Sequence, residues 1–262
     1  MLIEALGLER AGLIALCGAG GKTTLMFSLA REFVAAGERV LITTTTKIAR
    51  DEAEGWPSFA ATTQEQVLEN ARRLLPEAGR AGAVIAYSGV GGDGYRLVGF
   101  APEVVDAITR STEIDRILVE ADGSARKPLK APAAHEPVVP SATDALVIVA
   151  GLNGLGAPLL EENLFRAEIW ARLSGLALGS PITAESLAQC VAHADGLARG
   201  CPANASRMLF LNRADTPERR AEAKRIANFL GAAHGNMVER VVIGCLLPRP
   251  EIAEVVSFGS AA

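Results

Sequence analysis

The segment that most constrains this chain is Cys17–Leu25, which reads Cys-Gly-Ala-Gly-Gly-Lys-Thr-Thr-Leu. A short apolar run at 13–16 predicts a strand before it, and an amphipathic pattern at 22–36 predicts a helix after it. A strand, a glycine turn, a Lys-Thr pair and a helix are typical of a phosphate-binding loop, in which backbone N–H groups and the helix N-terminus face phosphate oxygens. The residues expected at the phosphates are Gly18, Ala19, Gly20, Gly21, Lys22, Thr23 and Thr24.

Two side chains of this loop have separate expected tasks. Lys22 neutralises the β- and γ-phosphates as a catalytic residue, and Thr23 gives its hydroxyl to Mg²⁺. The longer form of the signature begins with a glycine, at the position that Leu16 occupies here. An ordinary helix N-terminus after a turn is therefore an alternative, but the clustered glycines and the strand–loop–helix context favour the phosphate loop.

The composition excludes several classes of protein. The chain has 262 residues, of which 49% are hydrophobic and 21% charged, as in a globular protein. Its net charge of −4 argues against nucleic acid as the partner. No apolar stretch approaches the roughly 20 residues that span a membrane, and Glu4 and Glu9 do not suit a signal peptide. The 4 cysteines form no C-x-x-C pair, so we expect reduced thiols in the cytoplasm.

The segment 39–47 runs from apolar residues into four threonines and a lysine, and it predicts a strand with a polar end. In an open α/β sheet, the carboxyl ends of the strands line the ligand crevice. We therefore expect Thr45 and Lys47 near the bound phosphates. The alternative is that the threonines are present only because they favour strands.

A second polar strand end follows the apolar run at 116–120 and carries Glu120 and Asp122. The two carboxylates point to the same face of an extended strand, so both can reach one site. Asp122 is expected to bind Mg²⁺, and Glu120 or Asp122 to orient an attacking water as a catalytic residue.

The segment 123–140 is rich in proline and in cations. It is either a stiff, solvated crossover or a loop that folds over the nucleotide or a second substrate. In the second case, Arg126, Lys127 and Lys130 would face negative charge, either on the nucleotide or on an anionic acceptor. Lys130 would neutralise transition-state charge, and His135 or Glu136 would serve as an acid–base group.

The segment Asn212–Asp215 resembles the N-[KR]-x-D element of GTP-binding proteins, with Arg213 at the position of the usual lysine. Asn212 and Asp215 would then recognise guanine and reject adenine. The alternative is that Asp215 or Thr216 caps the helix that follows. GTP and ATP both remain candidates.

The remaining patterns predict the architecture. Strands alternate with helices, which predicts an α/β fold with an open, mostly parallel sheet of about seven strands and flanking helices, a three-layer sandwich like that of P-loop NTPases. We expect one domain over 1–262, in which 151–206 can form a helical insertion. The predicted strands are 13–16, 39–46, 83–87, 116–120, 144–150, 208–211 and 240–243, the predicted helices are 22–36, 64–75, 102–109, 161–173, 183–194 and 217–230, and 91–94 is a predicted hairpin tip.

Taken together, these segments resemble the YqeC family, the selenium-dependent molybdenum hydroxylase accessory proteins. The resemblance covers residues 12–250, and two positions depart from it: Phe165, where histidine is frequent, and Arg213, which replaces lysine. It implies a role in molybdenum enzyme maturation, with a molybdenum hydroxylase or its cofactor-maturation proteins as partners. The segments that carry it are Gly18–Thr24, Thr43–Lys47, Glu120–Ser124, Pro128–Pro132, His135–Pro137 and Leu211–Asp215.

Three functions are compatible with these residues. The first is Mg²⁺-dependent binding and hydrolysis of GTP or ATP by an accessory factor for a selenium-dependent molybdenum hydroxylase. The second is a P-loop kinase or ligase acting on a small anionic acceptor, because the short glycine loop also resembles that of Mur-type ligases. The third is a non-hydrolysing carrier of a molybdenum cofactor. The acid pair beside the phosphate loop favours the first.

Overall fold

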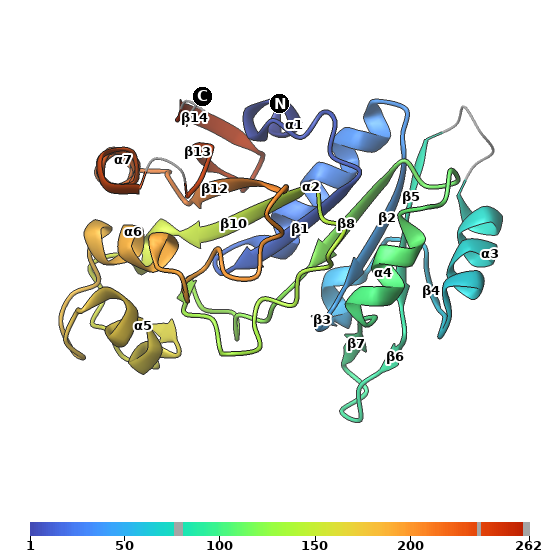
Figure 1. Cartoon of the computed structure of the whole chain (residues 1–262), viewed down its shortest axis with the longest axis horizontal. Coiled ribbons are helices and arrows are strands. Elements are labelled where there is room, and N and C mark those ends of the chain that lie inside the picture. Colours follow the sequence, from blue (N-terminus) through green and yellow to red (C-terminus); the bar gives the residue numbers. More distant parts are fainter. Residues whose placement is uncertain (76–80, 235–236, 259–262) are drawn as a thin grey trace.

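The computed structural model describes residues 1–75, 81–234 and 237–258. Within them, one large sheet has 9 strands in the order β14-β13-β12-β10-β1-β8-β2-β5-β4 (Figure 1). Every neighbouring pair is parallel except β13 and β14. The bounds are β1 Leu13–Gly18, β2 Arg39–Thr44, β4 Ser58–Ala60, β5 Gly82–Tyr87, β8 Arg116–Glu120, β10 Ala145–Gly151, β12 Ser206–Asn212, β13 Arg240–Cys245 and β14 Glu251–Ser257.

The structure confirms the predicted α/β class and the open, mostly parallel sheet. All seven predicted strands belong to it, and the sequence analysis misses only the strands at its two edges. β4 has 3 residues, and β14 alternates exposed and half-buried positions. Neither has the buried apolar run that identifies the central strands. The strand predicted at 240–243 is therefore not the last of the sheet, because the chain turns back and pairs as β14.

Helices cover both faces of the sheet and make three layers (Figure 1). α1 and α2 pack against one face, and α3 to α7 pack against the other. α5 begins six residues later than predicted, because the Glu161 carboxylate accepts the backbone N–H groups of Arg166 and Ala167 just before the helix. The bounds are α1 Leu2–Leu6, α2 Lys22–Ala35, α3 Gln64–Leu74, α4 Pro102–Ile108, α5 Ala167–Ser174, α6 Ala184–Ala192 and α7 Pro217–His234, with short 3₁₀ turns η1 Arg50–Ala53 and η2 Leu152–Gly154.

Two small sheets stand beyond the large one. β9 Leu129–Lys130 pairs with β11 Leu164–Phe165 and joins the proline-rich segment to the segment 151–206. The latter holds η2, β11, α5 and α6, and its description as an insertion in one domain stays a prediction. In the part of the chain described here, no helix has both the length and the apolar character needed to cross a membrane.

The second small sheet, β3-β7-β6, is antiparallel and extends from the end of β2. Its strands are β3 Lys47–Ala49, β6 Gly89–Val90 and β7 Arg96–Val98, so the predicted hairpin tip at 91–94 is confirmed. β2 ends at Thr44, and Lys47 starts a new strand instead of ending β2.

Gly99 holds this hairpin against the end of β2. Its N–H donates to the Thr46 carbonyl at 2.9 Å, and a Cβ added to Gly99 would lie 1.8 Å from the Thr44 carbonyl oxygen. The hairpin therefore approaches β2 as closely as only glycine permits.

We expect Gly99→Ala to lower the free energy of unfolding by about 1–3 kcal/mol, because the added methyl group pushes the hairpin away from β2. Gly92→Ala is the matched control, since a Cβ there meets nothing within 4 Å. Urea unfolding of both variants measures the difference. Equal midpoints for the two variants would show that the close approach at Gly99 does not constrain the hairpin.

Candidate functional site

The loop between β1 and α2 has the backbone that its glycines require. Gly18, Gly20 and Gly21 have φ values of 94°, 83° and 136°, all in the region that side chains disfavour. A Cβ on Gly18 would lie 2.2 Å from the Val149 carbonyl oxygen, and one on Gly20 would lie 2.5 Å from that of Pro128. The loop thus packs directly on β10 and on the proline-rich segment, with no room for side chains at these positions.

Lys22 is the first residue of α2, and its ammonium group is buried at the foot of this loop. Nζ donates to the Gly18 carbonyl at 2.8 Å and lies 3.3 Å from Asp122 Oδ1 and 3.8 Å from Glu120 Oε1. Burial by itself would lower the pKa of Lys22, but the charges of Asp122 and Glu120 raise it above its ordinary value. Lys22 is therefore cationic at neutral pH.

Asp122 begins a series of buried charges that continues away from the loop. Its carboxylate lies 2.9 Å from Lys130 Nζ and accepts the Gly18 N–H at 3.0 Å. Lys130 Nζ in turn donates to Glu136 at 2.6 Å, and the Arg166 guanidinium donates to the same carboxylate at 2.5 Å. The signs alternate along this series. We call Lys22, Asp122, Lys130, Glu136 and Arg166 the buried charge chain.

The buried charge chain changes the roles expected for Lys130 and Glu136. The ammonium group of Lys130 is shared by two carboxylates and does not line the cavity described below, so the structure does not favour contact with a substrate. Burial would raise the pKa of Glu136, but hydrogen bonds from Arg166 and Lys130 lower it to about 2. Glu136 is thus ionised at neutral pH and does not suit acid–base work.

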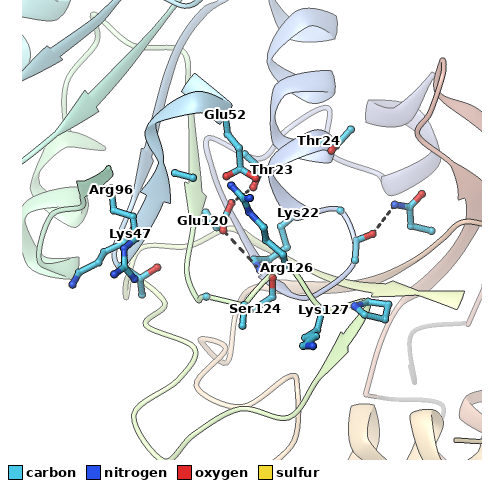
Figure 2. Close-up of a pocket in the computed structure, with 18 of the residues that line it drawn as sticks. Lys22, Thr23, Thr24, Lys47, Glu52, Arg96, Glu120, Ser124, Arg126 and Lys127 are labelled. Atoms are coloured by element: carbon cyan, nitrogen blue, oxygen red, sulfur yellow. Dashed lines mark hydrogen bonds and ion pairs between the residues drawn. The ribbon is translucent and has the colours of Figure 1, made fainter. Parts of the chain in front are cut away.

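An open cavity of about 1280 Å³ lies over the phosphate loop. The loop forms its floor, and its walls come from the end of β2, the β6–β7 hairpin, the segment 123–128 and the ends of β12 and β13 (Figure 2). Among the predicted site residues, those in the lining are Gly20, Gly21, Lys22, Thr23, Thr24, Thr45, Lys47, Glu120, His135, Glu136 and Asn212.

The two acids at the end of β8 differ in their access to this cavity. Glu120 lines it, and Thr23 Oγ1 donates to Glu120 Oε2 at 2.8 Å. Burial raises the pKa of Glu120, although Lys22 and Thr23 act in the opposite direction. Asp122 is only 1% exposed and does not line the cavity. The structure therefore favours Glu120 over Asp122 as the partner of Thr23 at a metal ion.

Three other predicted residues lie on the wall beside β2. Thr45 Oγ1 donates to the Val138 carbonyl at 2.6 Å, which ties the end of β2 to the proline-rich segment. Lys47 and His135 are exposed and line the cavity. His135 is thus accessible to a ligand, as the acid–base prediction requires.

Of the two residues expected to recognise guanine, only Asn212 lines the cavity. Asn212 is 3% exposed and donates to the Gly20 carbonyl at 2.7 Å, while its Oδ1 accepts the N–H of Leu246 at 3.1 Å. Asp215 is exposed, pairs with Arg219 at 2.5 Å and does not line the cavity. Asn212 therefore braces the phosphate loop. The structure does not favour guanine recognition by Asp215.

The sequence indicates that Arg126 faces negative charge, but it does not indicate the distant partners that position this side chain. Ala125 and Arg126 have φ values of 48° and 59°, and the Arg126 guanidinium reaches Tyr95 Oη at 2.8 Å and Asp51 at 3.3 Å. No local pattern identifies these contacts, because 31 and 75 residues separate the partners in the chain. Two consecutive non-glycine residues at positive φ become visible only in the folded backbone.

The acid dependence of stability tests the buried charge chain. The depressed pKa of Glu136 contributes stability above about pH 4.5, and this contribution is lost as the pH falls toward about 2. We expect Glu136→Gln to destabilise the chain most at neutral pH, and the difference from the unsubstituted chain to shrink through that window. Urea unfolding at several pH values measures this difference. Glu251→Gln, at a side chain that is 72% exposed, is the control. A loss of unfolding free energy in Glu136→Gln that does not change with pH would contradict the depressed pKa of Glu136 as the source of this stability.

Comparisons with known proteins agree with the sequence resemblance. A family model described as YqeC protein matches residues 14–168, more than half of the chain. The chain is 32% identical over 254 residues to the uncharacterized protein YqeC of Escherichia coli (strain K12), covering 97% of this chain and 94% of the relative. Among solved structures, the signal recognition particle 54 kDa protein of Aeropyrum pernix K1 in complex with GDP matches with a TM-score of 0.39 and 17% identity. That match covers 96% of this chain and 48%, about half, of that one. The chain belongs to the YqeC family.

Proposed function

We propose that this chain binds a nucleoside triphosphate with Mg²⁺ in the cavity over the phosphate loop and hydrolyses it. The observation that carries this proposal is the loop itself. Three glycines at positive φ, packed too tightly for side chains, lead directly into a helix whose first residue is the buried cation Lys22. Backbone N–H groups, a helix N-terminus and a lysine together form a site for a polyphosphate.

The residues around the loop fit a magnesium ion bound together with the phosphates. Thr23 and Glu120 supply two oxygen ligands at the edge of the cavity. In the described residues, no group of three or more His, Cys, Asp and Glu side chains is arranged to hold a metal by itself. Phosphate oxygens and water would complete the shell, as is usual for Mg²⁺. A bound ion would neutralise charge on the transferred phosphoryl group.

The chain's own residues then have distinct tasks. Lys22 turns from the Gly18 carbonyl and Asp122 toward the β- and γ-phosphates. Asp122 keeps its bonds to Lys130 and to the Gly18 N–H, so the loop stays in place. Glu120, which lines the cavity beside Thr23, orients the attacking water.

The cellular part of the proposal rests on the family resemblance. We propose that the chain assists maturation of a selenium-dependent molybdenum hydroxylase and contacts that enzyme or its cofactor-maturation proteins. The cytoplasm is the proposed location, which is supported by the free thiols of Cys17, Cys190, Cys201 and Cys245. No nucleic acid partner is proposed, in keeping with the net charge of −4.

A second candidate is transfer of the terminal phosphoryl group to a small anionic acceptor, as in a kinase or ligase. The observation that favours it is the volume of the cavity. At about 1280 Å³, the cavity exceeds the roughly 300–1,000 Å³ of most small-molecule sites, which leaves room for a second ligand beside a nucleotide.

Lys22→Ala should lower Mg²⁺-dependent release of phosphate from GTP or ATP about a hundredfold or more, because the cation nearest the phosphates is removed. Lys224→Ala, on the exposed side of α7, is the matched control. Phosphate release is measured with and without Mg²⁺, together with calorimetric titration of nonhydrolysable GTP and ATP analogues. Wild-type turnover by the Lys22→Ala chain would rule out the proposal.

The same titrations decide which base is recognised. We expect Asp215→Ala to leave the affinity for the GTP analogue within about twofold of the unsubstituted chain, because Asp215 is exposed and outside the cavity lining. Asn212→Ala should weaken both analogues, since it removes the brace on Gly20. If Asp215→Ala weakens the binding of the GTP analogue and leaves that of the ATP analogue unchanged, Asp215 does take part in guanine recognition.

A further inference from the structure

The cavity extends to both sides of the phosphate loop. One end lies at Asn212, Arg213 and Leu246, beyond the carboxyl ends of β12 and β13. The other end lies between η1, β3 and β7, beyond the end of β2. Because β1 lies between β12 and β2 in the sheet, the loop that follows β1 lies between these two ends. A nucleotide with its phosphates on the loop and its base toward Asn212 leaves the β3–β7 end free.

Two cations share one face of the antiparallel pair β3–β7 at this end. Lys47 is opposite Val98, and Arg96 is opposite Ala49, so Lys47 and Arg96 occupy diagonal positions of one face. Such positions are about 7–8 Å apart, close enough for two long side chains to hold one anion. Figure 2 shows Lys47 and Arg96 together at the side of the cavity, away from Lys22 and Thr24.

Arg126 approaches the same end from a third segment. Its position depends on the left-handed backbone of Ala125 and Arg126, a conformation that non-glycine residues seldom adopt and that is concentrated at functional sites. The guanidinium group reaches Tyr95, in the hairpin that carries Arg96, and Asp51, in η1. Cations from three segments of the sequence therefore line the cavity, and Arg126 contacts the hairpin that carries Arg96.

Two of the three cations have carboxylate partners. Arg96 pairs with Asp93, whose carboxylate also accepts the N–H groups of Tyr95 and Arg96. Arg126 pairs with Asp51, which does not line the cavity, and Figure 2 shows Glu52 beside Thr23 and Arg126 rather than beside Lys47. Among the ion pairs between described residues, none includes Lys47.

We propose that this end of the cavity binds a second small molecule through a phosphate or carboxylate group, held by Lys47, Arg96 and Arg126. The position of this ligand next to the nucleotide rests on the proposed function, whereas the anion site itself rests on the three cations. A chain that only hydrolyses a nucleotide has no need of a second anion site. The proposal therefore gives the acceptor of the kinase or ligase candidate a chemical class and a place.

The test titrates inorganic phosphate into the full chain and follows binding by phosphorus NMR. With Mg²⁺ and a nonhydrolysable triphosphate analogue saturating the loop, inorganic phosphate reports on the second site alone. We expect binding that the double substitution Lys47→Ala and Arg96→Ala weakens about tenfold or more, since two charge-assisted contacts are lost. Arg73→Ala, at an exposed position on α3 outside the cavity, is the matched control and should change binding less than twofold. Circular dichroism checks that each variant is folded.

The chain without nucleotide separates this inference from the proposed function. The second site is supported if the Lys22→Ala chain still binds inorganic phosphate and loses this binding when Lys47→Ala and Arg96→Ala are added. This result would hold even if no nucleotide binds. The inference is overturned if phosphate does not bind, or if the double substitution leaves phosphate binding unchanged. The affinity for nucleotide, measured in the same preparations, decides the proposed function separately. A competition with succinate then distinguishes the two classes of ligand. If succinate displaces the bound phosphate, the site accepts a carboxylate-bearing ligand; if it does not, the site takes a phosphate-bearing one.

Discussion

The interaction on which the rest of this site depends is the buried charge chain that joins the phosphate loop to the start of α5. An unpaired charge in a protein interior is strongly unfavourable, so each member requires its neighbours. Asp122 bridges Lys22 and Lys130, and Glu136 bridges Lys130 and Arg166. These pairs fix the proline-rich segment beside the loop and keep Lys22 protonated at the floor of the cavity. The segment 123–140 is therefore part of the structure that holds the loop.

The buried charge chain also links the ligand site to the helices beyond β10. In the proposed function, a polyphosphate on the loop competes with Asp122 for Lys22, while Asp122 retains Lys130. Arg166, at the far end, has φ of 66° and immediately precedes α5, and its guanidinium lies 4.2 Å from the centre of the Phe165 ring. The Phe165 ring thus covers the end of the buried charge chain. A change at Lys22 has a continuous path of contacts to this segment.

Membership of the YqeC family and the geometry of the site bear on different questions. The family resemblance underlies the proposed cellular setting, while the loop, Thr23 and Glu120 underlie the proposed chemistry. The volume of the cavity and the cations around Lys47 underlie the proposed second anion site on the side away from Asn212. A maturation factor that modifies a small anionic molecule would need that second site. One that only switches between nucleotide states would not.

The sequence by itself determined the glycine loop before α2, the seven central strands and the placing of Glu120, Asp122 and Thr45 at or just after strand ends, because the steric needs of glycine and hydrophobic periodicity are local. It did not determine the edge strands β4 and β14, which lack a buried apolar run, or the start of α5, which Glu161 sets. Only the tertiary structure decided that Lys130 faces two carboxylates, that Asn212 braces Gly20 and that Arg126 reaches Tyr95 and Asp51. Except for the Lys130–Glu136 pair, these contacts join different structural segments. The energy of a buried or charged side chain depends on which partners the fold brings to it, and no local pattern contains that information.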